Sequence, residues 1–218
     1  MSGVPPPLRT RALPARGDKR RLHVGLLGGS FNPAHAGHLK VARLALVRLQ
    51  LDQVWLLVSP GNPLKPRAGM APLADRLDSA RAIADGRRIV ATDIEQALGT
   101  RYTVDTVLRL RRLFPNVRFV WLMGADGLAE LPRWRRWRDI VRAVPIAVLP
   151  RPGYNHPALA GQAARRLAHA RRPGAAGPVL ANGPAPAWMF LTAPQTDISA
   201  TALRLAACGT WPRGGSSR

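Results

Sequence analysis

Apolar residues are grouped along this chain in two kinds of pattern. Short continuous apolar runs predict buried strands, because strands covered on both faces read as unbroken Val/Ile/Leu segments. Longer segments with apolar residues three or four positions apart predict amphipathic helices. The expected strands are 23–27, 53–59, 88–92, 118–123, 144–149 and 188–191. The expected helices are 38–49, 73–85, 103–114, 156–171 and 196–207, with short helical turns over 125–140.

Strands and helices therefore alternate, which predicts an α/β fold with a doubly wound parallel sheet. Ligands of such sheets bind at the carboxyl ends of the strands, near the point where the strand order reverses. Segments 60–72 and 173–186 are rich in Pro and Gly and are expected to be loops. We expect a single domain over residues 21–208, after a disordered basic leader at 1–20 and before a flexible tail at 209–218.

The most informative stretch joins the first expected strand to the first expected helix. It reads Gly28-Gly29-Ser30-Phe31-Asn32-Pro33-Ala34-His35-Ala36-Gly37-His38. Glycines let the backbone approach a ligand, the N–H groups of a helix start point at anions, and imidazoles supply further donors. The stretch therefore predicts a site for a phosphate chain.

Other kinds of site fit this stretch poorly. A Walker A loop needs Gly-x-x-x-x-Gly-Lys-Ser/Thr, and a dinucleotide-binding turn needs Gly-x-Gly-x-x-Gly with an acidic residue after the second strand. Neither spacing occurs here, and the second expected strand ends at Ser59-Pro60. His35 and His38 have no third ligand at a spacing typical of zinc sites, so no protein-bound metal is expected.

Composition narrows the class of protein further. The chain has 218 residues, a formal net charge of +21 and one cysteine, Cys208. No apolar run is long enough for a membrane span, and the lone cysteine suits a reducing cytoplasm. The charge leaves open an RNA-binding module, but the arginines are scattered without interleaved aromatic residues, so no specific nucleic acid is expected.

The histidine stretch resembles the His-x-Gly-His signature of the nucleotidyltransferase superfamily, and the resemblance extends over residues 22–207. Within it, the chain is similar to the bacterial nicotinate-nucleotide adenylyltransferases of NAD biosynthesis. The further matching blocks are Pro60–Lys65, Thr100–Thr106, Met123–Asp126 with Leu131–Trp134, and Ile198–Arg204. The resemblance implies a Rossmann-like nucleotidyltransferase fold and transfer of AMP from ATP to nicotinate mononucleotide, with release of pyrophosphate.

The same resemblance assigns roles to residues, with Mg²⁺ expected on ATP. The implied catalytic residues are His35, His38, Lys65 and Arg204. The implied ATP ligands are Gly28, Gly29, Ser30, Phe31, His35, His38, Gly124, Asp126, Ser199, Thr201 and Arg204. The implied ligands of nicotinate mononucleotide are Asn32, Lys65, Tyr102, Thr103 and Trp134, with the Trp134 ring stacked on the nicotinate.

Some features depart from the family pattern or admit another reading. Leu64 stands where the family carries His, and Ala200 stands where it carries Ser. Asn32 is equally well explained as a turn residue, and Arg76 as an arginine on a helix surface. Alternatives within the superfamily are a pantetheine-phosphate adenylyltransferase or a cytidylyltransferase, which the Gly-Ala-Asp and Leu-Pro-x-Trp blocks disfavour. Thr103 is expected to cap its helix.

Overall fold

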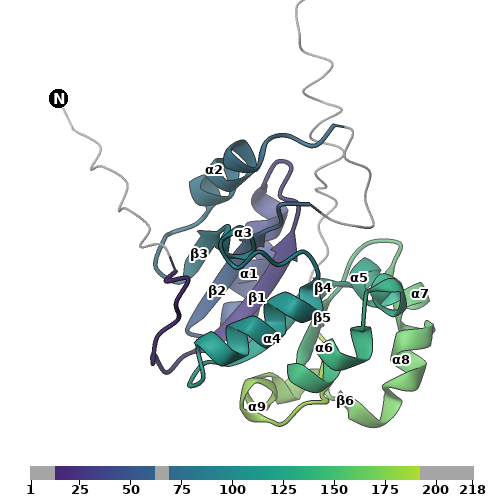
Figure 1. Ribbon diagram of the computed structural model, residues 1–218. Helices are drawn as coiled ribbons and strands as arrows, with labels where there is room; N and C mark the ends of the chain where they lie inside the picture. Colours follow the sequence, from purple (N-terminus) through teal and green to yellow (C-terminus); the bar gives the residue numbers. More distant parts are fainter. Residues whose placement is uncertain (1–12, 62–68, 192–218) are drawn as a thin grey trace, which may run out of the picture.

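The computed structural model describes residues 13–61 and 69–191 of the chain. Within these residues, seven strands form one parallel sheet in the order β3-β2-β1-β4-β5-β7-β6 (Figure 1). The strands are β1 His23–Gly29, β2 Gln53–Val58, β3 Ile89–Thr92, β4 Arg118–Gly124, β5 Ile146–Leu149, β6 Arg171–Arg172 and β7 Trp188–Phe190. The prediction of a doubly wound parallel sheet is confirmed.

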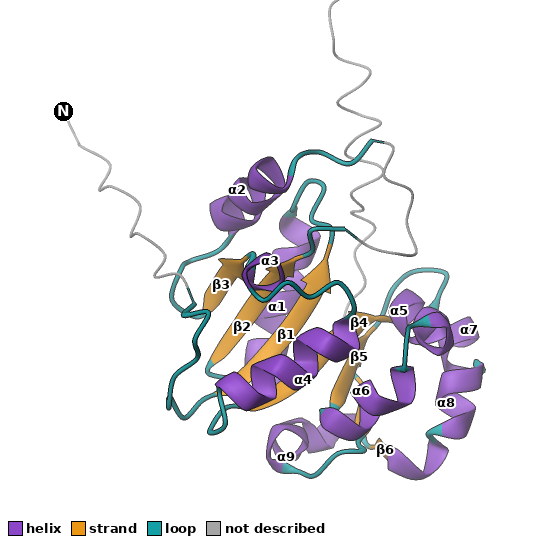
Figure 2. Cartoon of the chain, viewed as in Figure 1, coloured by secondary structure: helices purple, strands orange, loops and turns teal. Residues whose placement is uncertain are grey.

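Helices lie on both sides of the strands (Figure 2). They are α1 Ala36–Arg48, α2 Leu73–Ile83, α3 Ile94–Ala97, α4 Thr103–Leu113, α5 Ala125–Glu130, α6 Trp137–Ala143, α7 Asn155–Leu159, α8 Gln162–Arg166 and α9 Gly177–Asn182. Short 3-10 turns span Leu131–Arg133, Ala168–Ala170 and Gly174–Ala176. No helix among the described residues is both long and apolar enough to cross a bilayer.

Alternate residues of each central strand enter different layers of the core. Leu26 of β1 packs in the layer that contains α4, whereas Leu27 packs in the layer that contains α1 and α2. Because successive side chains of a strand point to opposite faces, a run that is apolar at every position requires cover on both faces. Figure 1 shows α4 in front of the sheet and α1 behind it.

The strand order reverses at β1. From β1 the chain passes to β2 and β3 on one side, and β4 and β5 lie on the other side. Ligands of open α/β sheets bind where the order reverses, at the carboxyl ends of the strands. The turn after β1, which carries the histidine stretch, lies at this position.

The chain differs from expectation between β5 and β7. The helix expected over 156–171 is two short helices, α7 and α8, and Gly161 between them is the N-cap of α8. The expected loop at 173–186 contains α9, which packs so closely on α1 that a Cβ on Gly177 would overlap the Arg48 carbonyl. The contact between Gly177 and Arg48 joins residues far apart in sequence.

Part of the expected leader also lies against the domain. Leu13 packs on the core layer of α4, and Gly17, with φ +73°, approaches the Leu113 carbonyl so closely that no Cβ would fit. The Asn116 side chain donates to the Lys19 carbonyl at 3.2 Å. Residues 13–20 are therefore in contact with the core, in contrast to the expectation of disorder for this part of the leader.

Candidate active site

The two histidines of the signature form the start of α1. His35 is the N-cap, and its Nδ1 accepts a hydrogen bond from the Gly37 N–H at 3.1 Å. In return, Nδ1 of His38 accepts from the His35 N–H at 3.2 Å. The ring centroids are 3.9 Å apart. This reciprocal capping holds both imidazoles at one helix N-terminus.

The capping bonds determine what the imidazoles offer a ligand. Because Nδ1 of each ring accepts, a neutral ring carries its proton on Nε2, which makes Nε2 a donor. Burial, and then the positive charge of Arg151, lower the pKa of His35. His35 is therefore neutral at pH 7 and acts as an N–H donor, while Arg151 supplies positive charge nearby.

The glycines before the histidines are needed for close packing. A Cβ on Gly28 would lie 2.8 Å from the indole of Trp121, and one on Gly29 would lie 3.2 Å from the Phe31 ring. Phe31 itself has φ +48° and is buried, with its ring 4.8 Å from the His38 ring. Phe31, expected as an ATP ligand, is thus a buried residue that packs against His38.

Two side chains of α2, Arg76 and Ser79, form hydrogen bonds with the backbone of the turn that follows β1. The Arg76 guanidinium donates to the carbonyls of Ser30 and Ser59 at 2.7 Å each, and to that of Ala71 at 2.9 Å. Arg76 is 2% exposed, so the expectation of a surface arginine was wrong. The Ser79 hydroxyl accepts from the Ala34 N–H at 3.1 Å.

Asn32 and Ser30 occupy different environments within the same turn. The Asn32 amide donates to the Gly69 carbonyl at 2.8 Å and accepts from the Ala71 N–H at 3.2 Å. These bonds favour the turn role of Asn32 over a substrate contact. The Ser30 hydroxyl oxygen is buried and has no hydrogen-bond partner among the described residues.

A carboxylate and an arginine meet at the ends of β4 and β5. Asp126, in the first turn of α5, accepts from the Arg151 guanidinium at 2.6 Å. A Cβ on Gly124 would overlap the Asp126 carboxylate, so glycine is required beside it. Asp126 was expected as an ATP ligand. In the structure it is paired with Arg151, the cation that also lowers the pKa of His35.

Three predicted ligands of nicotinate mononucleotide, Tyr102, Thr103 and Trp134, belong to the region around the start of α4. Tyr102, not Thr103, is the N-cap, and no side chain caps the helix. The Arg135 guanidinium lies 4.6 Å from the centroid of the Tyr102 ring. The Trp134 ring, next in the chain to Arg135, is partly buried and meets Trp121 edge to face at 6.1 Å.

Several predicted residues lie outside the described part of the chain. Lys65 falls within 62–68, and Ser199, Thr201 and Arg204 fall within 192–218. Across the residues that the structure does describe, no group of three or more His, Cys, Asp or Glu side chains is placed to hold a metal ion.

Arg151 was missed from the sequence and Arg76 was interpreted as a surface residue, although each carried a signal. Arg151 lies two residues after the end of β5, at the sheet edge where ligands bind. Arg76 shares the helical spacing of Leu77 and Ala80, which are buried, and of Leu73, which packs against the same core. An arginine on an apolar face indicates a buried guanidinium with backbone acceptors.

Comparison with known proteins gives consistent results. The family model described as cytidylyltransferase-like matches residues 26–206. A probable nicotinate-nucleotide adenylyltransferase of Gluconobacter oxydans is 68% identical over 183 residues, covering 84% of this chain and 94% of that protein. Another from Gluconacetobacter diazotrophicus is 62% identical over 196 residues, covering 90% and 91%.

The fold has a counterpart among solved structures. Nicotinic acid mononucleotide adenylyltransferase of Plasmodium falciparum, complexed with NaAD, matches with a TM-score of 0.64 at 15% identity, covering 84% of this chain and 82% of that one. At this identity the match concerns the fold alone. The family model and the two bacterial relatives show that the chain belongs to the cytidylyltransferase-like family and, within it, to the nicotinate-nucleotide adenylyltransferases.

Proposed function

We propose that this chain catalyses attack by the phosphate of nicotinate mononucleotide on the α-phosphorus of ATP. A new bond forms between a phosphate oxygen and the α-phosphorus, the bond to the β-phosphate oxygen breaks, and pyrophosphate leaves. Such transfer requires positioning of two polyanions and stabilisation of charge, without a covalent enzyme intermediate. The proposal includes a cytoplasmic location, which the lone cysteine of the sequence, Cys208, suits.

One observation carries the proposal most directly. His35 and His38 are locked by reciprocal capping at the start of a 13-residue helix, with both Nδ1 atoms engaged. In the neutral rings the proton lies on Nε2, the atom that we propose donates to phosphate oxygens, beside the helix N–H groups and the exposed backbone of Gly28. The Arg151 guanidinium, which is paired with Asp126, lies at the same sheet edge and acts on His35. In this proposal Lys65, Ser199, Thr201 and Arg204 complete the phosphate contacts.

The acceptor nucleotide is proposed to bind at the start of α4. Thr103 and Val104 are the first residues of this helix, and Tyr102 offers no side-chain cap to their N–H groups. An uncapped helix start favours an anion such as the nicotinate carboxylate. Trp134 supplies an aromatic face for the ring, and Arg135 adds positive charge beside Tyr102.

Mg²⁺ is proposed to enter with ATP and to be held mainly by phosphate oxygens and water. The donor set around His35 consists of imidazole, guanidinium and backbone N–H groups, which suit phosphate oxygens, whereas Mg²⁺ requires oxygen ligands. Asp126, the carboxylate at this edge, is already paired with Arg151 at 2.6 Å. When bound, Mg²⁺ neutralises charge on the triphosphate.

The test is product analysis with purified protein, ATP and Mg²⁺. The acceptors are nicotinate mononucleotide, nicotinamide mononucleotide and phosphopantetheine, offered separately at equal concentration. We expect the deamido dinucleotide and pyrophosphate in equal amounts from the first acceptor, and a smaller kcat/KM with the second. Dephospho-coenzyme A as the main product would overturn the proposal in favour of a pantetheine-phosphate adenylyltransferase.

A further inference from the structure

Three buried polar side chains connect α3 to the start of α4, and the proposed reaction uses none of them. Glu95 is 8% exposed, Thr100 is 7% exposed and Thr106 is fully buried. Buried carboxyls are rare in proteins unless a specific partner holds them. Here the partner is the Thr106 hydroxyl of α4, the helix that begins at the proposed nicotinate site.

The three side chains form one hydrogen-bonded chain. The Thr106 hydroxyl lies 2.9 Å from Oε1 of Glu95 and 2.9 Å from the Thr100 hydroxyl. It also lies 3.4 Å from the carbonyl oxygen of Tyr102, the N-cap of α4. The Thr100 N–H donates to the Glu95 carbonyl at 2.9 Å, which closes the loop between the two helices.

We propose that Glu95 is a positioning residue that acts through Thr106 on the start of α4 and thereby tunes binding of the nicotinate carboxylate there. This inference rests on the proposed function, because it takes the nicotinate ring to bind at that helix start. Glu95 acts through the hydroxyl and the helix, without touching the substrate.

The hydroxyl of Thr106 has a single proton, so the polarity of the chain depends on Glu95. An ionised Glu95 carboxylate can only accept a hydrogen bond, so the Thr106 hydroxyl donates to it. A protonated Glu95 can donate to Thr106, which frees the Thr106 proton for Thr100 or for the Tyr102 carbonyl. The two protonation states therefore present different hydrogen bonds to the N-cap residue of α4.

Charge acts in the same direction as hydrogen bonding. Burial raises the pKa of the Glu95 carboxyl to about 7, although the hydrogen bond from Thr106 opposes the rise. Above that pH a negative charge appears beside the helix start, where it disfavours a second anion. Nicotinate mononucleotide should therefore bind more tightly when Glu95 is protonated.

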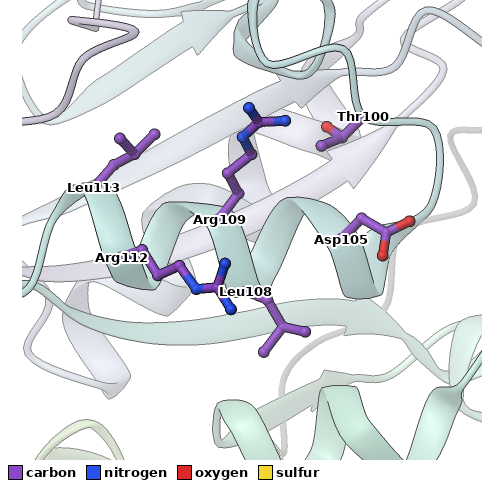
Figure 3. A pocket seen from close by; sticks show the side chains of 6 residues that line it. All are labelled: Thr100, Asp105, Leu108, Arg109, Arg112 and Leu113. Atoms are coloured by element: carbon purple, nitrogen blue, oxygen red, sulfur yellow. The ribbon is translucent and has the colours of Figure 1, made fainter.

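Other charged or titratable groups near Glu95, Thr100 and Thr106 belong to α4, to the segment between α3 and α4, and to the N-cap of α3. Strand β2, on which α3 packs, carries no titratable side chain. The Arg109 guanidinium on α4 donates to the Leu98 carbonyl at 2.9 Å. Arg109, Asp105 and Thr100 also line an open groove of about 450 Å³ along α4 (Figure 3). The remaining titratable neighbours in the chain are Asp93, Arg101 and Tyr102.

The kinetic test compares wild type, Glu95→Gln and Glu130→Gln between pH 6 and 8.5. Glu130 is the only other glutamate of the sequence and is exposed, so its substitution makes the same chemical change as a control. We expect the ratio of the KM for nicotinate mononucleotide in wild type to that in Glu95→Gln to rise about fivefold between pH 6 and 8.5. A factor of this size corresponds to weak coupling between two sites. The KM for ATP should follow one profile in all three proteins.

Identical profiles of the nicotinate mononucleotide KM in wild type and Glu95→Gln, with active enzyme, would overturn the inference alone. Failure of wild type to form the deamido dinucleotide at any pH would overturn the proposed function as well. A pH-independent loss of kcat in Glu95→Gln would indicate a purely structural role, which also contradicts the inference.

A second readout needs no catalysis. With ¹³C-labelled glutamate, the two carboxyl carbons are assigned by the Glu130→Gln variant, and Glu95 is titrated alone. We expect its midpoint near pH 7, a higher midpoint in Thr106→Val, and a higher midpoint with nicotinate mononucleotide bound, as reciprocity requires. A midpoint insensitive to both changes would overturn the inference.

Discussion

The guanidinium of Arg76 lies 2.7 Å from the backbone carbonyl of Ser30, across 46 positions of sequence. The same nitrogen reaches the carbonyl of Ser59 at the end of β2. A buried cation of α2 thus joins the ends of two neighbouring strands beneath the turn over residues 28–38, here called the phosphate turn because we propose that it binds the phosphates of ATP. Burial lowers the pKa of Arg76, and the group remains charged because arginine starts from a very high value.

Replacing Arg76 by Met should destabilise the fold and the phosphate turn together. The variant loses three hydrogen bonds and leaves backbone carbonyls without donors, so we expect a loss of about 2–4 kcal/mol in the free energy of unfolding. The KM for ATP should rise more than that for nicotinate mononucleotide. Urea unfolding and steady-state kinetics measure both, and Arg81→Met, on the exposed side of the same helix, is the control. Equal stability of the two variants would contradict the role of Arg76.

Removing the Nε2 donor of His38 should slow catalysis far more than it weakens binding. Loss of one donor to transition-state charge costs about 10²–10³ in kcat. His38→Ala also removes the acceptor for the His35 N–H, whereas His38→Asn retains an acceptor near the position of Nδ1. We expect both variants to be slow, and Asn to be better folded. A near-normal kcat in a folded His38→Asn protein would exclude the role, and the exposed His156→Ala serves as the control.

Substrate choice should depend on the start of α4 and not on Trp134. We expect nicotinate mononucleotide to be preferred over the amide, because a carboxamide leaves polar groups unpaired at about 1–3 kcal/mol per group. Trp134→Ala should raise the KM for both nucleotides and largely keep their ratio. The measurement is kcat/KM for each nucleotide in both proteins. An unchanged KM in the variant would assign Trp134 to packing against Trp121 alone.

Two truncations should have different effects on stability, because only the second part of the expected leader contacts the core. Deletion of residues 1–12, which show no periodic apolar pattern, should leave melting temperature and activity unchanged. Deletion of residues 1–20 also removes the contacts of Leu13, Gly17 and Lys19, and should cost about 1–2 kcal/mol while activity is retained. Thermal melts of the two truncated proteins measure the difference. Equal melts would show that residues 13–20 contribute nothing to stability.

Glu95 should also affect how stability depends on pH. Its pKa is about 7 in the fold against 4.5 for the free group, so the folded state holds the proton longer. The stabilisation is present below about pH 4.5 and is lost as the pH rises through 7, by at most about 3 kcal/mol. The difference in unfolding free energy between wild type and Glu95→Gln, measured at several pH values, isolates this effect. A difference that does not vary with pH would contradict it.

The comparison between expectation and structure separates local from long-range causes. The central strands and helices α1, α2 and α4 were predicted to within a few residues, because their apolar spacing is a local property of the sequence. The segment between β5 and β7 was not: α7 and α8 are separate helices on either side of Gly161, and α9 packs on the end of α1. Close approach between distant backbones leaves no local periodicity to detect.

The sequence by itself determined the parallel sheet, the phosphate turn and the family, since strand runs, glycine spacing and the histidine pair are encoded within short stretches. Only the tertiary structure decided that Arg76 is buried beneath Ser30, that Arg151 pairs with Asp126, and that Glu95 meets Thr106. The last two pairs lie 25 and 11 positions apart in the chain. Burial and pairing of a charge depend on which elements the fold packs together, and desolvation then sets the protonation of the groups brought into contact.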